Sequence, residues 1–276
     1  MQLVDLKFRP GVDKQDTAYS AGDERKYIDS DFVRFHYGKP ERWGGWTNLP
    51  NPNRTIVGVV RDTHSWVGLD GLRYLALGTD RKLYIYNEGA VFDITPIRET
   101  QALTNPFTTN GTTTVSVADT SHNAKQGDFV TFDSFSSIDG LDMNQEFEII
   151  AITDANNYTV THTSTASGST SGGGGSGNAK YQINVGPATS TYGLGWGTDT
   201  WSSGTWGTAS SSSDVVLVGR NWSLDNFGED LIATVLDGGT FIWDTSSGTG
   251  TRATALSNAP TASRFSLVST DTRHLL

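Results

Sequence analysis

The sequence contains no cysteine, so neither disulfide bonds nor thiolate metal sites can contribute to its fold. No run approaches the roughly 18 apolar residues that suggest a membrane-spanning helix, and the N-terminal MQLVDLKFRPGVDKQD has no apolar signal segment. The five histidines are scattered without the spacing of a metal-ligating or catalytic set. We therefore expect no membrane span and no metal or organic cofactor.

Basic residues are also scarce, because 20 Lys and Arg stand against 30 Asp and Glu and give a formal net charge of -10. Such a protein gains no counterion release from DNA phosphates, which disfavours ordinary nucleic-acid binding. Most of the acidity belongs to one segment. Between Glu99 and Gly177, nine acids accompany the single base Lys125, a net charge of -8.

Aromatic and turn-forming residues are plentiful. The 276 residues include 11% aromatics and 31 glycines but only 8 prolines. Aromatic and β-branched side chains favour pleated sheets, glycines suit tight turns, and no long run has helical periodicity. The composition predicts an all-β protein with one large or two smaller domains.

The first half of the chain divides into an arm and a set of short strands. Residues 1–54 form a polar N-terminal arm, with a strand at Phe32–Tyr37 and a turn at Gly38–Pro40. Residues 55–98 contain five β-like runs separated by turns, which is typical of propeller blades or a sandwich. These runs are Thr55–Asp62, Ser65–Asp70, Leu72–Asp80, Lys82–Gly89 and Ala90–Thr95.

Residues 99–178 read as a small acidic β-barrel or sandwich inserted into the larger body. They hold four alternating runs, with a turn at Asp154–Asn157. The stretch Thr163–Gly177 contains only Gly, Ser, Thr and Ala, too little apolar surface to offset its ordering entropy, and predicts a flexible loop or linker.

Residues 179–276 return to propeller blades. Tyr181–Gly186 is predicted as a strand, and Ser223–Gly248 as strand, Asp-Gly-Gly turn and strand. The final Arg264–Leu276 resembles a strand inside an unfinished blade, so we expect an incomplete propeller with unpaired edges.

Acidic residues are the first candidates for chemistry. Glu146 and Glu148 lie two apart on a predicted strand and so face one side. A glycoside hydrolase needs two acids that converge across a cleft, which two acids on one strand face do not show. A solvated strand face is therefore the preferred interpretation. Asp133, Asp139 and Asp142 crowd one loop that could offer oxygen ligands to calcium, but their spacing matches no known motif.

Glycine-rich segments give weaker signals. Gly172–Gly175 lacks the lysine and hydroxyl of a phosphate-binding loop, and the GLGWGT run beginning at Gly193 lacks the third glycine of a dinucleotide fingerprint. Ser223–Gly228 only partly matches the Asp-box turn of sialidase propellers, because its glycine is one position late and the tryptophan is missing. We therefore assign no catalytic, cofactor-binding or metal-binding residue.

Three tryptophans recur every five residues among glycines, at Trp196, Trp201 and Trp206. This spacing suits neither a strand nor a helix. Aromatic side chains of this kind can pack a loop or a subunit interface, or stack on sugar rings. Packing or an interface is the preferred interpretation, with sugar binding as the alternative.

Several phrases, in their order along the chain, resemble the tail-nozzle or packaged-DNA stabilisation proteins of short-tailed bacteriophages. They are Asp31–Phe35 with Gly38–Trp46, Leu77–Thr79 with Leu83–Tyr86 and Asp93–Pro96, the Gly-Trp-Gly-Thr repeat, Trp222–Leu231 with Trp243–Asp244, and Arg273–Leu276. The segment from His122 to Val160 is similar to small β-barrel modules of phage tail proteins.

The resemblance implies a non-enzymatic structural protein of the virion, assembled in the host cytoplasm. Its expected fold is a β-propeller-like body, and its copies would form a ring homo-oligomer, usually a hexamer. That ring would extend the DNA channel below the portal and adaptor and help retain and release packaged DNA. Expected partners are other copies, the portal-adaptor and other tail proteins, and passing DNA without sequence-specific binding. The alternative functions are a carbohydrate- or receptor-binding β-protein and a propeller-type glycan hydrolase.

Overall fold

The chain divides into two units, Met1–Pro50 and Asn51–Leu276. The computed structural model describes residues 9–15, 17, 19–21, 26–45, 56–186 and 219–276. Within these residues, no helix is long and apolar enough to cross a membrane.

The first unit contains one described hairpin, in which β1 (Val33–His36) pairs with β2 (Lys39–Arg42). The predicted turn at Gly38–Pro40 therefore begins one residue early, at Tyr37, and Pro40 lies inside β2. Proline is tolerated there because a two-stranded sheet has only edge strands.

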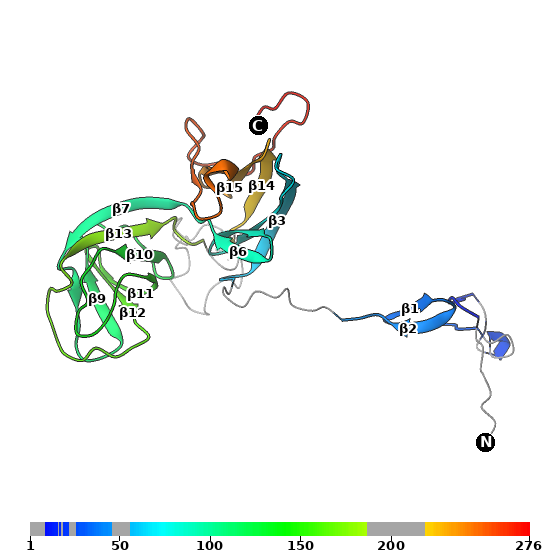
Figure 1. Cartoon of the computed structure of the whole chain (residues 1–276), viewed down its shortest axis with the longest axis horizontal. Coiled ribbons are helices and arrows are strands. Elements are labelled where there is room, and N and C mark those ends of the chain that lie inside the picture. Colours follow the sequence, from blue (N-terminus) through cyan, green and yellow to red (C-terminus); the bar gives the residue numbers. More distant parts are fainter. Residues whose placement is uncertain (1–8, 16, 18, 22–25, 46–55, 187–218) are drawn as a thin grey trace, which may run out of the picture. The chain divides into compact units, whose positions relative to one another are not determined.

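The second unit begins with a four-stranded antiparallel sheet whose strands pair in sequence order (Figure 1). Its strands are β3 (Val60–Val67), β4 (Arg73–Thr79), β5 (Leu83–Asn87) and β6 (Ala90–Asp93). The prediction of two strands before residue 70 was wrong. β3 is one strand, and a bulge between Val60 and Asp62 interrupts the alternation that the sequence shows.

A second antiparallel sheet repeats this meander near the C-terminus, in the order β14-β15-β16-β17. Its strands are β14 (Trp222–Phe227), β15 (Asp230–Val235), β16 (Thr240–Trp243) and β17 (Thr254–Ala255). The Asp-Gly-Gly turn lies between β15 and β16, as predicted. A short 3-10 helix, η2 (Thr245–Ser247), follows β16.

The two four-stranded sheets pack face to face, with β14 against β3 and β4 (Figure 1). They share one hydrophobic core, in which the Trp66, Tyr74 and Trp243 rings lie 5.4–6.5 Å apart between centroids. Sequential four-stranded meanders stacked on a common core are the arrangement of neighbouring propeller blades. The predicted all-β, propeller-like fold is confirmed.

Between the two blades, the chain forms a seven-stranded sheet in the order β7-β13-β10-β11-β12-β9-β8. Its strands are β7 (Ile97–Thr104), β8 (Phe107–Thr108), β9 (Thr114–Ala118), β10 (Phe129–Asp133), β11 (Glu146–Asp154), β12 (Asn157–Thr161) and β13 (Ser176–Gln182). The predicted turn at Asp154–Asn157 joins β11 to β12. Tyr181 and Gln182, which we expected in the returning blade, belong to β13 of this sheet.

The seven-stranded sheet closes on itself. β7 and β8 occupy opposite ends of the sheet order but are separated in sequence only by Asn105 and Pro106. The Asn105 amide donates to the carbonyl of Gly175 (2.7 Å), and Phe107 and Gly173 exchange two backbone hydrogen bonds (3.2 and 2.8 Å). The sheet is therefore a barrel, and its interior is filled by aromatic and aliphatic side chains.

Residues 163–175, within the segment predicted as a flexible loop or linker, do form an irregular loop, but their glycines lie close against the barrel core. A Cβ atom on Gly174, whose φ is +100°, would lie 2.5 Å from Cδ2 of Phe107. A Cβ atom on Gly173 would lie 2.6 Å from Cδ1 of Ile138, and one on Gly177 would lie 2.4 Å from the carbonyl oxygen of Asp133. Only glycine lets the backbone approach the core this closely.

Gly174→Ala should therefore destabilise the barrel by about 1–3 kcal/mol, through overpacking against Phe107 and an unfavourable φ. Calorimetric unfolding of the full chain measures this loss. Gly250→Ala is the matched control, because Gly250 has open space around its Cα and an ordinary φ. Equal stability of the two variants would contradict the close-approach explanation.

Candidate functional site

The most densely connected polar cluster surrounds Lys82, at the turn between β4 and β5. Thr79 organises this turn, because its Oγ1 accepts hydrogen bonds from the backbone amides of Arg81 (3.1 Å) and Lys82 (2.7 Å). The Lys82 side chain is only 3% exposed. A buried ammonium is costly unless it is paired, so its neighbours determine what this site can do.

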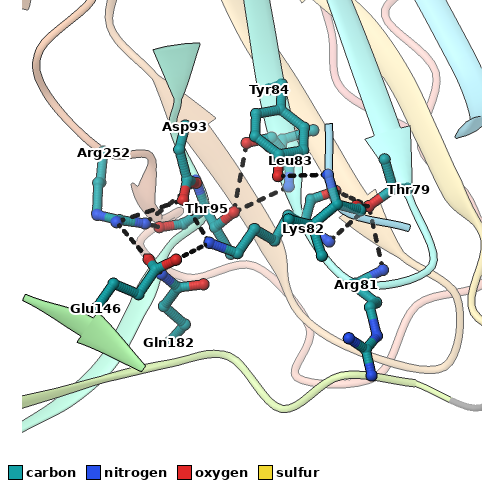
Figure 2. A network of polar contacts seen from close by, with 11 residues as sticks. Thr79, Arg81, Lys82, Leu83, Tyr84, Asp93, Thr95, Glu146, Gln182 and Arg252 are labelled. Carbon is teal, nitrogen blue, oxygen red and sulfur yellow. Dashed lines mark hydrogen bonds and ion pairs between the residues drawn. The ribbon is translucent and has the colours of Figure 1, made fainter. Parts of the chain in front are cut away.

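Two carboxylates meet the Lys82 ammonium, one from the first blade and one from the barrel (Figure 2). Nζ of Lys82 lies 2.9 Å from Oδ2 of Asp93 in β6 and also donates to Oε1 of Glu146 in β11. Arg252, just before β17 of the second blade, approaches both acids, at 3.2 Å from Asp93 and 3.5 Å from Glu146. Gln182 of β13 donates to the remaining oxygen of Glu146.

The barrel makes further contacts at the same turn. Arg81 pairs with Glu148 of β11 at 2.9 Å. The Lys82 ammonium also lies 4.3 Å from the ring centroid of Phe129 in β10, a cation–π geometry. Both cations of the turn therefore engage the barrel, and Lys82, Arg252 and their acids join the two blade sheets and the barrel sheet.

We call Lys82, Arg252, Asp93 and Glu146 the charged joint, and its two cations lower the pKa of Asp93. Burial alone would raise the pKa of Asp93, but the charges of Lys82 and Arg252 and hydrogen bonds from Thr95 and Lys82 outweigh it, so that the pKa lies below its ordinary value. A glycoside hydrolase acid needs the opposite shift, because it must carry a proton at working pH.

A cavity of about 480 Å³ opens beside the charged joint. Its wall includes Lys82, Asp93, Glu146 and Arg252, together with Tyr84, whose pKa burial raises to about 12. Each of the four charged side chains already has an oppositely charged partner. The arrangement is suited to holding sheets together.

Glu146 and Glu148 share one side of β11, as predicted, and their side chains are 32% and 37% exposed to solvent. That side also faces the β4–β5 turn, where Glu146 binds Lys82 and Glu148 binds Arg81, which the sequence did not predict. These two ion pairs were missed because their cations lie 64 and 67 residues earlier in the chain. No local sequence pattern connects them.

The three loop aspartates have separate partners. Asp133 pairs with Lys180 and Asn178, Asp139 accepts from Thr109 and Thr170, and Asp142 accepts from the Asn144 backbone and side chain. Among the described residues, no group of three or more His, Cys, Asp or Glu side chains could hold a metal ion.

The structure describes the partial Asp-box match but not the tryptophan repeat. Ser223–Gly228 forms most of β14 and the start of a tight turn, with Gly228 at a φ of +70°. Trp196, Trp201 and Trp206, like the GLGWGT run, lie outside the described residues.

A second polar cluster is buried inside the barrel. The Tyr181 hydroxyl donates to Oδ2 of Asp119 and lies 2.8 Å from the Tyr158 hydroxyl. Oδ1 of Asp119 is buried without a hydrogen-bond partner. Burial raises the pKa of Asp119 above its ordinary value, against the opposing effect of the Tyr181 hydrogen bond.

Comparisons with known proteins give little further information. No family model matches the chain, and no curated protein matches it. Among solved structures, the chain is similar to "Phage phi92 endosialidase", with 12% sequence identity and a TM-score of 0.27. The match covers 74% of this chain, which spans about a third (32%) of that endosialidase chain. A likeness at this level carries no argument about function.

Lys82→Met should cost about 3 kcal/mol, because it leaves two buried or half-buried carboxylates with one cation fewer. It should also uncouple the barrel from the blades. Residues 97–182 contain no tryptophan, so tryptophan fluorescence does not report on the barrel directly, whereas circular dichroism reports on the barrel and the blades together. The two unfolding curves should separate in the variant.

Lys180→Met is the matched control for the charged joint. Lys180 pairs with Asp133, but its side chain is 43% exposed, so its removal should cost about 0–1 kcal/mol and leave the two curves together. Coincident curves for Lys82→Met would show that the joint does not couple the sheets.

Asp119→Asn tests the buried cluster through pH. Because the folded-state pKa of Asp119 is raised, its contribution to stability is fully present below the unfolded pKa and is lost as pH rises through the folded value. The stability of Asp119→Asn relative to the parent should therefore increase from acidic to neutral pH, as measured by urea unfolding. Asp154, whose pKa is lowered by hydrogen bonds from the Asn156 backbone and the Asn157 side chain, should give the opposite trend in Asp154→Asn. A pH-independent difference for Asp119→Asn would contradict the assignment.

Proposed function

We propose that this chain is a structural protein of a phage tail. Its copies would form a ring, of hexameric order, that extends the DNA channel below the portal and adaptor and helps retain and release packaged DNA. The order of the nozzle-like phrases along the sequence supports this assignment. The phrases that lie on described strands belong to β1 and β2 and to the two blades.

The observation that carries the proposal is a propeller-like body that exposes several large apolar side chains. Two blades share one core, yet large hydrophobic side chains are exposed on β3 and in the C-terminal segment. They include Val67 (61% exposed), Phe265 (71%) and Leu276 (73%). Exposed apolar surface beside a well-packed core favours association with other subunits.

The charge distribution is compatible with a conduit for DNA. The barrel segment between Glu99 and Gly177 carries a net charge of -8, which repels phosphates instead of retaining them. The described acids at the joint are paired with cations, an arrangement suited to holding parts together.

Sedimentation velocity of the purified full chain, followed by electron microscopy of the largest species, tests the proposal. We expect a concentration-dependent oligomer that appears as rings and co-sediments with purified tail complexes. A stable monomer at all concentrations, without binding to tail complexes, would contradict it.

A further inference from the structure

The C-terminal segment occupies the position of a third blade. Oδ2 of Asp225, on β14 of the second blade, accepts a hydrogen bond at 2.7 Å from the amide of Val268 in the C-terminal segment. The contact between the first two blades has the same form, because Oδ2 of Asp62 on β3 accepts from the Leu224 amide of β14 at 3.1 Å. In both contacts, an aspartate on the first strand of one blade accepts a hydrogen bond from the backbone of the layer that follows it.

The same segment folds back as a hairpin. Leu267 and Leu276 exchange two backbone hydrogen bonds (3.1 and 2.9 Å), and the Ser269 amide donates to the carbonyl of His274 at 2.8 Å. Ser266, on the side facing the second blade, is buried and bonds Ser223 and Thr234. We call residues 265–276 the C-terminal hairpin.

The outward side of this hairpin is apolar and open to solvent. Phe265, Leu267 and Leu276 are 71%, 55% and 73% exposed. A two-stranded hairpin is only marginally stable alone. Among the described residues, the second blade covers one side of this hairpin and no layer covers its outward side.

The first blade also has a face turned away from β14. It presents Val67, which is 61% exposed, and the half-buried Leu75, Leu77 and Tyr86, with the exposed polar residues Thr63, Ser65 and Arg73 beside them. Tyr84, on the same face, is instead covered near Val57, whose amide donates to its hydroxyl at 3.0 Å. We call Val67, Leu75, Leu77 and Tyr86 the outer face.

The outer face and the C-terminal hairpin lie at opposite ends of one stack, with the first and second blades between them. The C-terminal hairpin and the outer face of one chain therefore point away from each other and cannot meet within the described residues. They can meet between two copies of the chain. The hairpin of one copy would then pack on the outer face of the other in the way that the second blade packs on the first. Such a contact is heterologous, and heterologous contacts build rings or filaments.

We infer that the C-terminal hairpin of one copy docks on the outer face of a second copy, head to tail. This inference rests on the proposed self-assembly and names the interface that produces it. The occupant of each surface is the other surface of a second identical chain.

The test uses two single variants of the full chain, Val67→Asp on the outer face and Leu267→Asp on the hairpin. Both side chains are more than half exposed, so the fold should survive, and circular dichroism checks that it does. Each variant should weaken self-association at least tenfold in sedimentation velocity. Ile150→Asp, at a 45% exposed position on β11, is the control and should associate like the parent.

Mixing the two variants gives the sharper result. Each pair retains one intact hairpin and one intact outer face, so the mixture should form dimers but no larger species. Larger oligomers of either variant alone would overturn the docking mode while leaving self-assembly standing. A mixture that stays monomeric would also overturn it. A parent chain that is monomeric at all concentrations would overturn self-assembly and the inference together.

Discussion

The burial of a single ammonium constrains how this molecule is put together. Lys82 is almost inaccessible to solvent, and burying its ammonium would be costly without carboxylate partners. The first blade supplies Asp93, the barrel supplies Glu146, and Arg252 of the second blade balances the two acids. Because the partners come from three sheets, satisfying one buried charge fixes how the inserted barrel meets the blades (Figure 2).

The barrel interrupts the propeller-like body but returns the chain close to where it left. β7 and β13, its first and last strands, are neighbours in the sheet, and the Ile183 amide still bonds the carbonyl of Pro96 at 3.0 Å. An insertion whose ends lie together can be accommodated without separating the elements on either side. The second blade can therefore pack on the first despite the intervening sequence.

The strands could be predicted from the sequence because their signals are local. Alternation identified β4, β5 and β12, and the Asp154–Asn157 and Asp-Gly-Gly turns carried their own residue chemistry. The close packing of the glycine run against the barrel core was missed, because composition indicates how much apolar surface a segment can bury but not which other residues lie against its backbone. Gly174 is required by Phe107, a residue 67 positions earlier, and the residues of the Lys82–Glu146 pair are 64 positions apart. Contacts between residues this far apart in the sequence produce no periodic pattern that could be recognised in it.

The central claim is that propeller-like layers continue from one copy of the chain to the next. The absence of native cysteine permits a direct measurement, because Val67→Cys and Leu267→Cys can be combined in one chain and treated with a short bismaleimide. The account predicts a ladder of intermolecular products that persists on dilution to the lowest concentration at which the parent remains assembled. Ile150→Cys combined with Leu267→Cys should give no such ladder. Only monomers or intramolecular links from the first pair, with the parent still assembled, would contradict the account.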